Sequence, residues 1–233
     1  MPAKPPADSL RIVESDIIEC ALCPRLRAHC EEVARVKRRA YRHQQYWGKP
    51  VPSFGDPKAR VLIVGLAPAA HGANRTGRMF TGDRSGDFLY AVLHKTGFAS
   101  QPVSHWRDDG LALKGLWITA SAHCAPPDNK PTPEEIRTCR QFLQREVTLL
   151  TEIRVVVALG RIAFDNYLAT LRARGFALRL SDLPFEHGRV HAPGPGLPAL
   201  ISCYHPSQQN TSTGRLTEPM LLSVFEAARK LAF

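Results

Sequence analysis

The sequence lacks the features that mark membrane and secreted proteins. No apolar run among its 233 residues approaches the roughly 20 residues that span a bilayer. The N-terminal stretch MPAKPPADSLRIVESD also lacks the apolar core of a secretory signal. We therefore expect a cytoplasmic protein without membrane contact, in which thiols stay reduced. Six cysteines in such a chain favour metal or redox chemistry over disulfides.

Acidic residues are scarce relative to basic ones. The chain has 21 Asp and Glu against 31 Lys and Arg, which gives a formal net charge of +10. This balance favours a polyanionic partner such as DNA or RNA. No basic amphipathic helix with exposed aromatic anchors is evident, which disfavours a lipid surface. The basic stretch 35–42 (RVKRRAYR) is the densest part of this charge, although it could also be a solvated helix face.

The common phosphate-binding motifs are absent as well. The chain has neither a G-x-x-x-x-G-K-[ST] loop nor a G-x-G-x-x-G turn after a strand. Their absence disfavours a metabolic enzyme that acts on a phosphorylated small molecule.

Four continuous apolar runs predict buried parallel strands, because a sheet that is covered on both faces needs no polar alternation. They are 60–68, 114–121, 153–160 and 197–205. Helical segments are expected at 10–20, 25–47 (a basic helix or arm), 86–95, 132–150, 161–174 and 218–231. Strand–helix alternation predicts an α/β protein, a three-layer α/β/α sandwich with a central, mainly parallel four-stranded sheet. We expect one domain over 1–233, with 1–8 as a frayed tail.

Ligands of open α/β sheets bind beyond the carboxyl ends of the strands. That rule selects the loops 65–84, 121–131, 160–162 and 204–216. The first loop offers small residues for close backbone approach, including Gly65 and Ala67, and then Phe80 and Asp83. Phe80 could stack on a flat base or belong to the core. Asp83 could serve chemistry or cap the helix that follows.

The last loop places His205 directly before a proline at the end of a strand. The polar residues Ser207, Gln208 and Gln209 follow and could enter a nucleic-acid groove. His205 is then a candidate catalyst, with a purely structural role as the alternative and His71 as a competitor. Asn129, in the second loop, could read a base edge or simply occupy a turn.

The cysteines fall into two distant pairs. Cys20 and Cys23 form a C-x-x-C, and Cys124 and Cys139 follow much later. The C-x-x-C does not recur, so the zinc signal is weak, but the four thiolates could hold one iron–sulfur or zinc group. Cys30 is a possible substitute ligand, and four unconnected buried thiols are the alternative. Cys203 reads as a core residue.

Three motifs together resemble one known family. Gly65-Leu66-Ala67-Pro68-Ala69, Gly77-Arg78-Met79-Phe80-Thr81-Gly82-Asp83 and His205-Pro206-Ser207 are similar to motifs of the uracil-DNA glycosylase superfamily, and the best match is its family 5. The resemblance covers the chain from about residue 20 to 225. It implies a DNA-repair enzyme with the superfamily's fold and a structural [4Fe–4S] cluster at Cys20, Cys23, Cys124 and Cys139. Separately from the resemblance, we expect a monomer.

On this resemblance, the protein flips uracil, and other deaminated or damaged bases, out of DNA and hydrolyses the N-glycosidic bond. The expected roles are as follows: Phe80 stacks on the base, Asn129 binds its edge, His205 donates to the uracil O2, and Asp83 orients water. Other superfamily members carry Asp, Asn or Glu in the first motif, whereas GLAPA is apolar here, as in family 5.

The resemblance also implies a set of DNA contacts. Arg75, Arg78, Ser207 and the stretch 35–42 would hold phosphates, and Gln208 and Gln209 would fill the gap in the duplex. No lysine lies in the motif loops, so an intact abasic site is the expected product. A non-catalytic nucleic-acid-binding module stabilised by a metal is the alternative.

Overall fold

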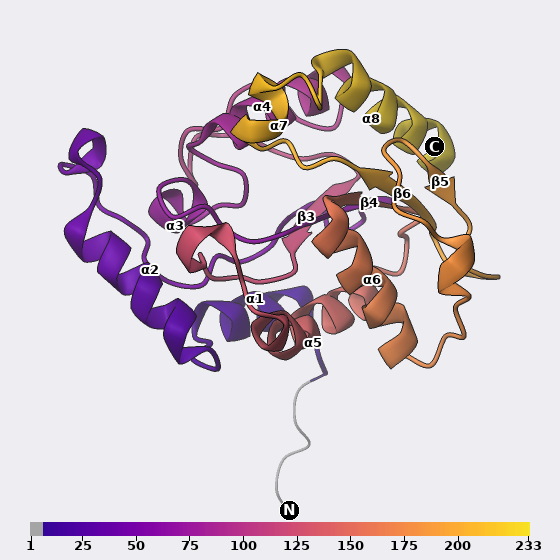
Figure 1. Ribbon diagram of the computed structural model, residues 1–233, viewed down its shortest axis with the longest axis horizontal. Helices are drawn as coiled ribbons and strands as arrows, with labels where there is room; N and C mark the ends of the chain where they lie inside the picture. Colours follow the sequence, from indigo (N-terminus) through magenta and orange to yellow (C-terminus); the bar gives the residue numbers. More distant parts are fainter. Residues whose placement is uncertain (1–6) are drawn as a thin grey trace, which may run out of the picture.

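The fold is built around one six-stranded sheet. The computed structural model of the protein describes residues 7–233 (Figure 1). The strands lie in the order β1 (Phe54–Gly55), β3 (Leu116–Ala120), β2 (Val61–Gly65), β4 (Val155–Leu159), β6 (Ala199–Cys203) and β5 (Val190–His191). The four inner strands are parallel, which confirms the predicted sheet. The two antiparallel edge strands were not predicted, because two residues are too few to form a hydropathy pattern.

The inner strands are buried on both faces. Side chains alternate across the sheet, so that Ile63 packs in one core cluster while its neighbours Leu62 and Val64 pack in the other. Every residue of β2, β3 and β4 is buried. The continuous apolar runs of the sequence therefore reflect a sheet with two covered faces.

Helices cover the two faces and complete the three layers (Figure 1). Helices α4 (Arg84–Lys95) and α8 (Glu218–Ala232) pack on one face. Helices α5 (Pro133–Leu149) and α6 (Arg161–Ala173) pack on the other, and α1 (Leu10–Ile18) lies against α5. The predicted α/β/α sandwich is confirmed.

Local signals fix the start of α5. Thr132 accepts a hydrogen bond from the Glu135 N–H (3.2 Å), and the Glu135 carboxylate accepts one from the Thr132 N–H (2.7 Å). This capping box, with Pro133 at the first helical position, satisfies donors that the helix leaves unpaired.

The N-terminal part differs from the prediction in two ways. The basic helix α2 (Pro24–Val36) ends earlier than 47, since Lys37 adopts a positive φ of 58° and a short turn, η1 (Arg39–Tyr41), follows. The expected tail 1–8 lies partly outside the described residues, but its last residue does not fray. The Asp8 carboxylate forms an ion pair with Arg145 (2.7 Å) that holds the chain against α5.

Short helical segments occupy the loops at the carboxyl ends of the strands. They are α3 (Ala73–Thr76), η2 (Pro127–Asn129) and α7 (Gln208–Ser212), and a further turn, η3 (Leu180–Asp182), precedes β5. Within residues 7–233, no helix combines the length and apolarity needed to cross a bilayer. The extent of a single domain over 1–233 stays a prediction.

Candidate active site

A cavity of about 990 Å³ lies at the carboxyl ends of the parallel strands. It is walled by the loops that follow β2, β3 and β6, where the ligand rule for open sheets places a site. Nine predicted site residues line it: Gly65, Ala67, Phe80, Asp83, Asn129, His205, Ser207, Gln208 and Gln209. The structure therefore brings both predicted catalytic residues and all four predicted substrate-binding residues to one cavity.

The rings of Phe80 and His205 lie close together in this cavity. Their centroids are 6.0 Å apart and their planes are tilted by 32°. The two residues come from the loops after β2 and β6, which flank β4 in the sheet. Gly160, directly after β4, has a φ of +98°, which favours glycine, and a Cβ there would be in ordinary contact with the His205 Cβ at 3.4 Å.

His205 is held by its backbone rather than by its ring. The Asn210 side-chain amide donates to the His205 carbonyl (2.8 Å), and no residue from 7 to 233 hydrogen-bonds the imidazole. Burial lowers the pKa of His205 to about 4, so the ring is neutral at pH 7. A neutral imidazole with unpaired nitrogens can donate a hydrogen bond to a ligand in the cavity.

Phe80 is fixed by two glycines. Its φ is +52°, an uncommon value for a residue with a side chain. A Cβ at Gly65 would lie 3.0 Å from the Phe80 ring, and a Cβ at Gly86 would lie 1.7 Å from the Phe80 carbonyl oxygen. Gly86 therefore has no room for a side chain, and Gly65 allows the Phe80 ring to lie close against the end of β2.

Asp83 caps the helix that follows it and also lines the cavity. Its Oδ1 accepts a hydrogen bond from the Gly86 N–H (3.0 Å), which makes it the N-cap of α4. Its Oδ2 packs on Gly72, where a Cβ would approach to 2.0 Å. Burial raises the pKa of Asp83 above its ordinary value. The carboxyl group is thus a helix cap that also lines the cavity.

Asn129 reaches the rim through a strained turn. Asp128 and Asn129 have φ values of +53° and +57°, and asparagine and aspartate tolerate this region better than most residues. Asn129 is exposed, and among the described residues its side-chain amide has no hydrogen-bond partner. It is both a turn residue and free to bind a ligand edge.

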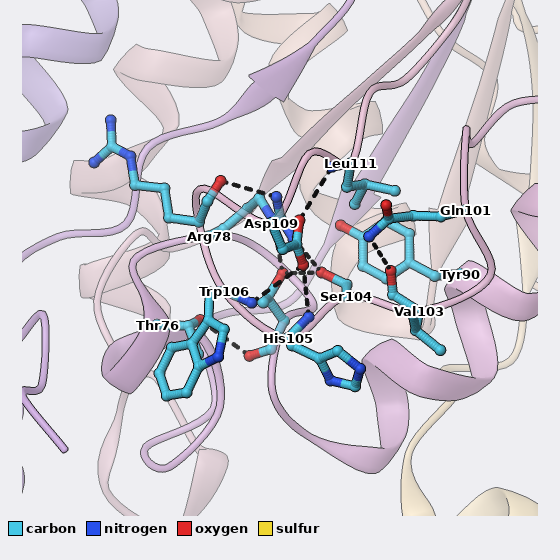
Figure 2. Close-up of polar contacts among 12 residues, drawn as sticks. Thr76, Arg78, Tyr90, Gln101, Val103, Ser104, His105, Trp106, Asp109 and Leu111 are labelled. Atoms are coloured by element: carbon cyan, nitrogen blue, oxygen red, sulfur yellow. Dashed lines mark hydrogen bonds and ion pairs between the residues drawn. The ribbon is translucent and has the colours of Figure 1, made fainter.

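The predicted phosphate contacts of Arg75 and Arg78 are wrong. Arg78 is 4% exposed and forms a buried ion pair with Asp109 (2.7 Å), while it also donates to Ser104 (2.7 Å) (Figure 2). Arg75 is 5% exposed and donates to the carbonyls of His71 (2.8 Å) and Gly82 (2.7 Å). Both guanidinium groups are occupied within the fold, so they stabilise the first loop instead of meeting DNA.

Several cavity residues were not predicted as site residues. Arg84 and Lys130 are exposed basic residues at the rim. Arg38 and Tyr41, which belong to the predicted stretch 35–42, line the cavity from the N-terminal side. Arg84 directly follows Asp83 and Lys130 follows Asn129, so adjacency to predicted site residues was the available signal. Lys130 lies outside the three motifs, so the expectation that the motif loops hold no lysine stands beside a lysine at the rim. His71 lines the same cavity, but its Nδ1 bonds the Tyr46 hydroxyl (3.0 Å).

The four predicted metal-ligating cysteines line a second, small pocket. Cys20 and Cys23 lie in the turn between α1 and α2, Cys124 follows β3, and Cys139 belongs to α5. Burial raises the pKa of the Cys23 thiol to about 11 and raises that of Cys139. Burial also raises the pKa of Cys20, and the hydrogen bond with Cys30 raises that of Cys124. The charge of Arg27, which lines the same pocket, offsets only part of these rises.

Four cysteine thiols around one pocket are a donor set that a thiolate-ligated group could use. Among the residues that the structure describes, no three His, Cys, Asp or Glu side chains gather closely enough to hold a single metal ion. An iron–sulfur cluster spreads four thiolates over several irons, so it suits four cysteines around one pocket. Cys30 is not part of the lining: its Sγ accepts from the Ala125 N–H (3.2 Å). Cys203 is buried in β6, as predicted for a core residue.

The comparisons with known proteins agree with this geometry. Residues 52–229 match the family described as the uracil DNA glycosylase superfamily. A type-5 uracil-DNA glycosylase of Thermus thermophilus is 55% identical over 213 residues, 91% of this chain and 94% of that protein. Type-5 uracil-DNA glycosylases of Mycobacterium bovis (52% identical; 97% and 83% of the two chains) and Pyrobaculum aerophilum (44%; 91% and 88%) are also similar. The chain therefore belongs to the uracil-DNA glycosylase superfamily, in its type-5 family.

Proposed function

We propose that this protein excises uracil from DNA by hydrolysing the N-glycosidic bond. The observation that carries the proposal is the shared cavity into which Phe80 and His205 bring an aromatic ring and a neutral imidazole. A base inside a duplex cannot reach such a cavity, so the nucleotide is flipped out before the bond breaks. The names of the type-5 relatives support the same reaction.

The cavity supplies binding groups suited to a pyrimidine. The Phe80 ring offers a face for stacking, and the Asn129 amide offers both a donor and an acceptor for the Watson–Crick edge. Gly65 and Ala67 keep side-chain bulk away from the strand end. A cavity of this size with an apolar first motif also accommodates larger bases, and we include deaminated purines among the proposed substrates.

His205 stabilises the departing base. Negative charge develops on the uracil O2 as the glycosidic bond lengthens, and a positioned donor there favours the transition state over the ground state. A preorganised donor of this kind lowers the activation free energy by about 3–4 kcal/mol. The neutral imidazole keeps one N–H, and this is the group that donates to the uracil O2.

Asp83 orients the attacking water. The helix cap fixes Oδ1 through Gly86, which leaves the carboxyl group rigid at the cavity wall. Its raised pKa makes it a stronger base than an exposed aspartate, which helps it accept a proton from water. The apolar residues of the first motif offer no competing acid.

The rim provides the remaining DNA contacts. Arg38, Arg84 and Lys130 are exposed cations that line the cavity, and Arg84 and Lys130 take the phosphate-binding role that Arg75 and Arg78 cannot fill. Gln208 and Gln209 begin α7 and are exposed, while Ser207 caps this helix by accepting from the Asn210 N–H (3.4 Å). The two glutamines are placed to occupy the gap that a flipped base leaves.

A structural [4Fe–4S] cluster held by Cys20, Cys23, Cys124 and Cys139 is part of the proposal. The four cysteines join α1 and α2 to α5 and to the loop after β3, so the group would tie the N-terminal helices to the sheet. Arg27 offsets part of the negative charge of four thiolates. The reaction does not pass through this group.

The test uses labelled DNA with a single G·U pair. Wild-type protein is expected to release free uracil and to leave a site that alkali cleaves. Absence of base release with intact binding would favour a non-catalytic binding module instead. Borohydride trapping separates hydrolysis from lyase chemistry: no covalent complex should form, even though Lys130 lines the rim.

Size-exclusion chromatography tests the proposed monomer, and cell fractionation tests the proposed cytoplasmic location.

A further inference from the structure

Trp106 is an exposed tryptophan beside the cavity that the reaction itself does not use. Its side chain is 44% exposed, although large aromatic side chains are usually covered in a folded protein. It lies in the loop between α4 and β3, outside the segments that line the cavity. Exposure of this kind marks a candidate contact surface.

The Trp106 loop is rigid, because a buried carboxylate organises it. Asp109 accepts hydrogen bonds from the backbone N–H groups of His105 (2.7 Å), Trp106 (3.2 Å) and Leu111 (3.1 Å). The same carboxylate is paired with buried Arg78. Figure 2 shows the indole of Trp106 and the ring of His105 directed away from Asp109. The backbone is therefore held from within while the indole faces outward.

Trp106 and the cavity residue Tyr41 both lie against the guanidinium group of Arg75. Arg75 lies between two aromatic rings, 4.1 Å from the Tyr41 centroid and 5.3 Å from the Trp106 centroid. Tyr41 and Arg38 both line the cavity, and Arg38 is an exposed cation. Arg38, Tyr41 and Trp106, which we call the Trp106 strip, thus lead from the cavity to the outer surface.

We propose that the Trp106 strip binds the nucleotide next to the target in single-stranded DNA, with its unpaired base stacked on Trp106. The proposal rests on the proposed function, because the target nucleotide must occupy the cavity. Aromatic rings interleaved with cations are the features by which proteins hold unpaired nucleotides. The positive charge of the strip and of the whole chain fits a phosphate backbone. Paired bases are stacked on their neighbours and do not offer a free face to the indole.

Binding is measured with a fluorescent single-stranded oligonucleotide that carries a tetrahydrofuran abasic mimic at the target position, so no catalysis is required. Trp106→Ala is expected to weaken binding about five- to tenfold, within the range for one stacked base, and Trp106→Phe should restore most of it. Phe176→Ala is the matched control, since Phe176 is also an exposed ring beside an arginine, Arg174, but lies outside the cavity. It should bind as the wild type does.

A second abasic mimic tests the stacking itself. This second mimic is placed next to the target, on the 5′ side in one oligonucleotide and on the 3′ side in another. On one of the two sides it should weaken binding by the wild type. It should not change the affinity of Trp106→Ala on either side. The proposal would be overturned if Trp106→Ala bound as tightly as the wild type. It would also be overturned if Trp106→Ala lost the same affinity on DNA with the neighbouring base as on DNA without it. Failure of the proposed function gives a different result, namely no uracil release by a wild type that still binds DNA.

Discussion

The ring centroids of Phe80 and His205 lie 6.0 Å apart, although Phe80 follows β2, His205 follows β6, and β4 separates these two strands in the sheet. Neither residue alone would identify a site, since phenylalanine occurs in most hydrophobic cores and most histidines have structural roles. Their meeting in one cavity, with Asp83 and Asn129 on its walls, is what connects the fold to the chemistry of base release.

Removal of the imidazole should slow base release much more than it weakens binding. For His205→Ala we expect the single-turnover rate on G·U DNA to fall about 10²–10³-fold, because a preorganised donor acts on the transition state. Binding of DNA with an abasic mimic should stay within a few-fold of wild type. His71→Ala is the control, since the Nδ1 of His71 is already engaged by Tyr46. A rate for His205→Ala close to that of the wild type would remove His205 from the mechanism.

The protonation of His205 gives a prediction that needs no substrate. Burial lowers its pKa from 6.5 to about 4, so the ring should titrate well below the ordinary histidine value in an NMR titration. The unfolded chain binds a proton near pH 6.5, whereas the folded state does so only near pH 4. Stability should therefore fall as the pH decreases between these values, and His205→Gln should remove part of this fall in urea denaturation. Titration near pH 6.5 would contradict the burial argument.

The two roles of Asp83 can be separated with two variants. Asparagine can still cap α4 through its carbonyl oxygen, so Asp83→Asn should keep the thermal stability but lose about 10²–10⁴-fold in rate. Asp83→Ala should lose the same activity and about 1 kcal/mol of stability, because the cap is lost as well. Thermal unfolding and single-turnover kinetics measure the two effects. If Asp83→Asn keeps its rate, the residue is only a cap.

The strands and the main site loops could be predicted because their signals are local. Continuous apolar runs gave β2, β3, β4 and β6, and the end of each strand gave the place of the cavity. Local sequence also indicated that Asp83 could cap α4, as one of two roles considered for this residue, and the structure shows the cap.

The partners of Arg75 and Arg78 could not be predicted, because the same guanidinium chemistry fits a phosphate and a buried carboxylate. Asp109 lies in another loop, and only the folded chain brings it to Arg78. In the same way, the left-handed turn at Asp128 and Asn129 carries Lys130 to the rim, which the sequence does not show.

The cysteine assignment predicts a colour and a composition. Protein purified without oxygen should be brown and contain about four irons and four sulfides per chain, as a [4Fe–4S] group requires. Cys139→Ser should lose most of both and lower the thermal stability, because α5 is then no longer joined to α1 and α2. Cys203→Ala is the control, since Cys203 is buried in β6 away from the pocket and should keep its iron. Iron-free wild type that holds zinc instead would contradict the cluster.

The reassignment of the arginines predicts opposite behaviour for Arg78 and Arg84. Arg78→Ala leaves the Asp109 carboxylate without its partner in a mostly buried setting, so we expect a loss of about 3–5 kcal/mol in the free energy of unfolding. Arg84→Ala should leave stability unchanged but reduce the slope of log affinity against log salt by about one, since one phosphate contact is lost. Arg179→Ala, an exposed arginine outside the cavity lining, should change neither quantity. If Arg78→Ala were as stable as the wild type and had a smaller slope of log affinity against log salt, Arg78 would contact a phosphate after all, as the sequence first suggested.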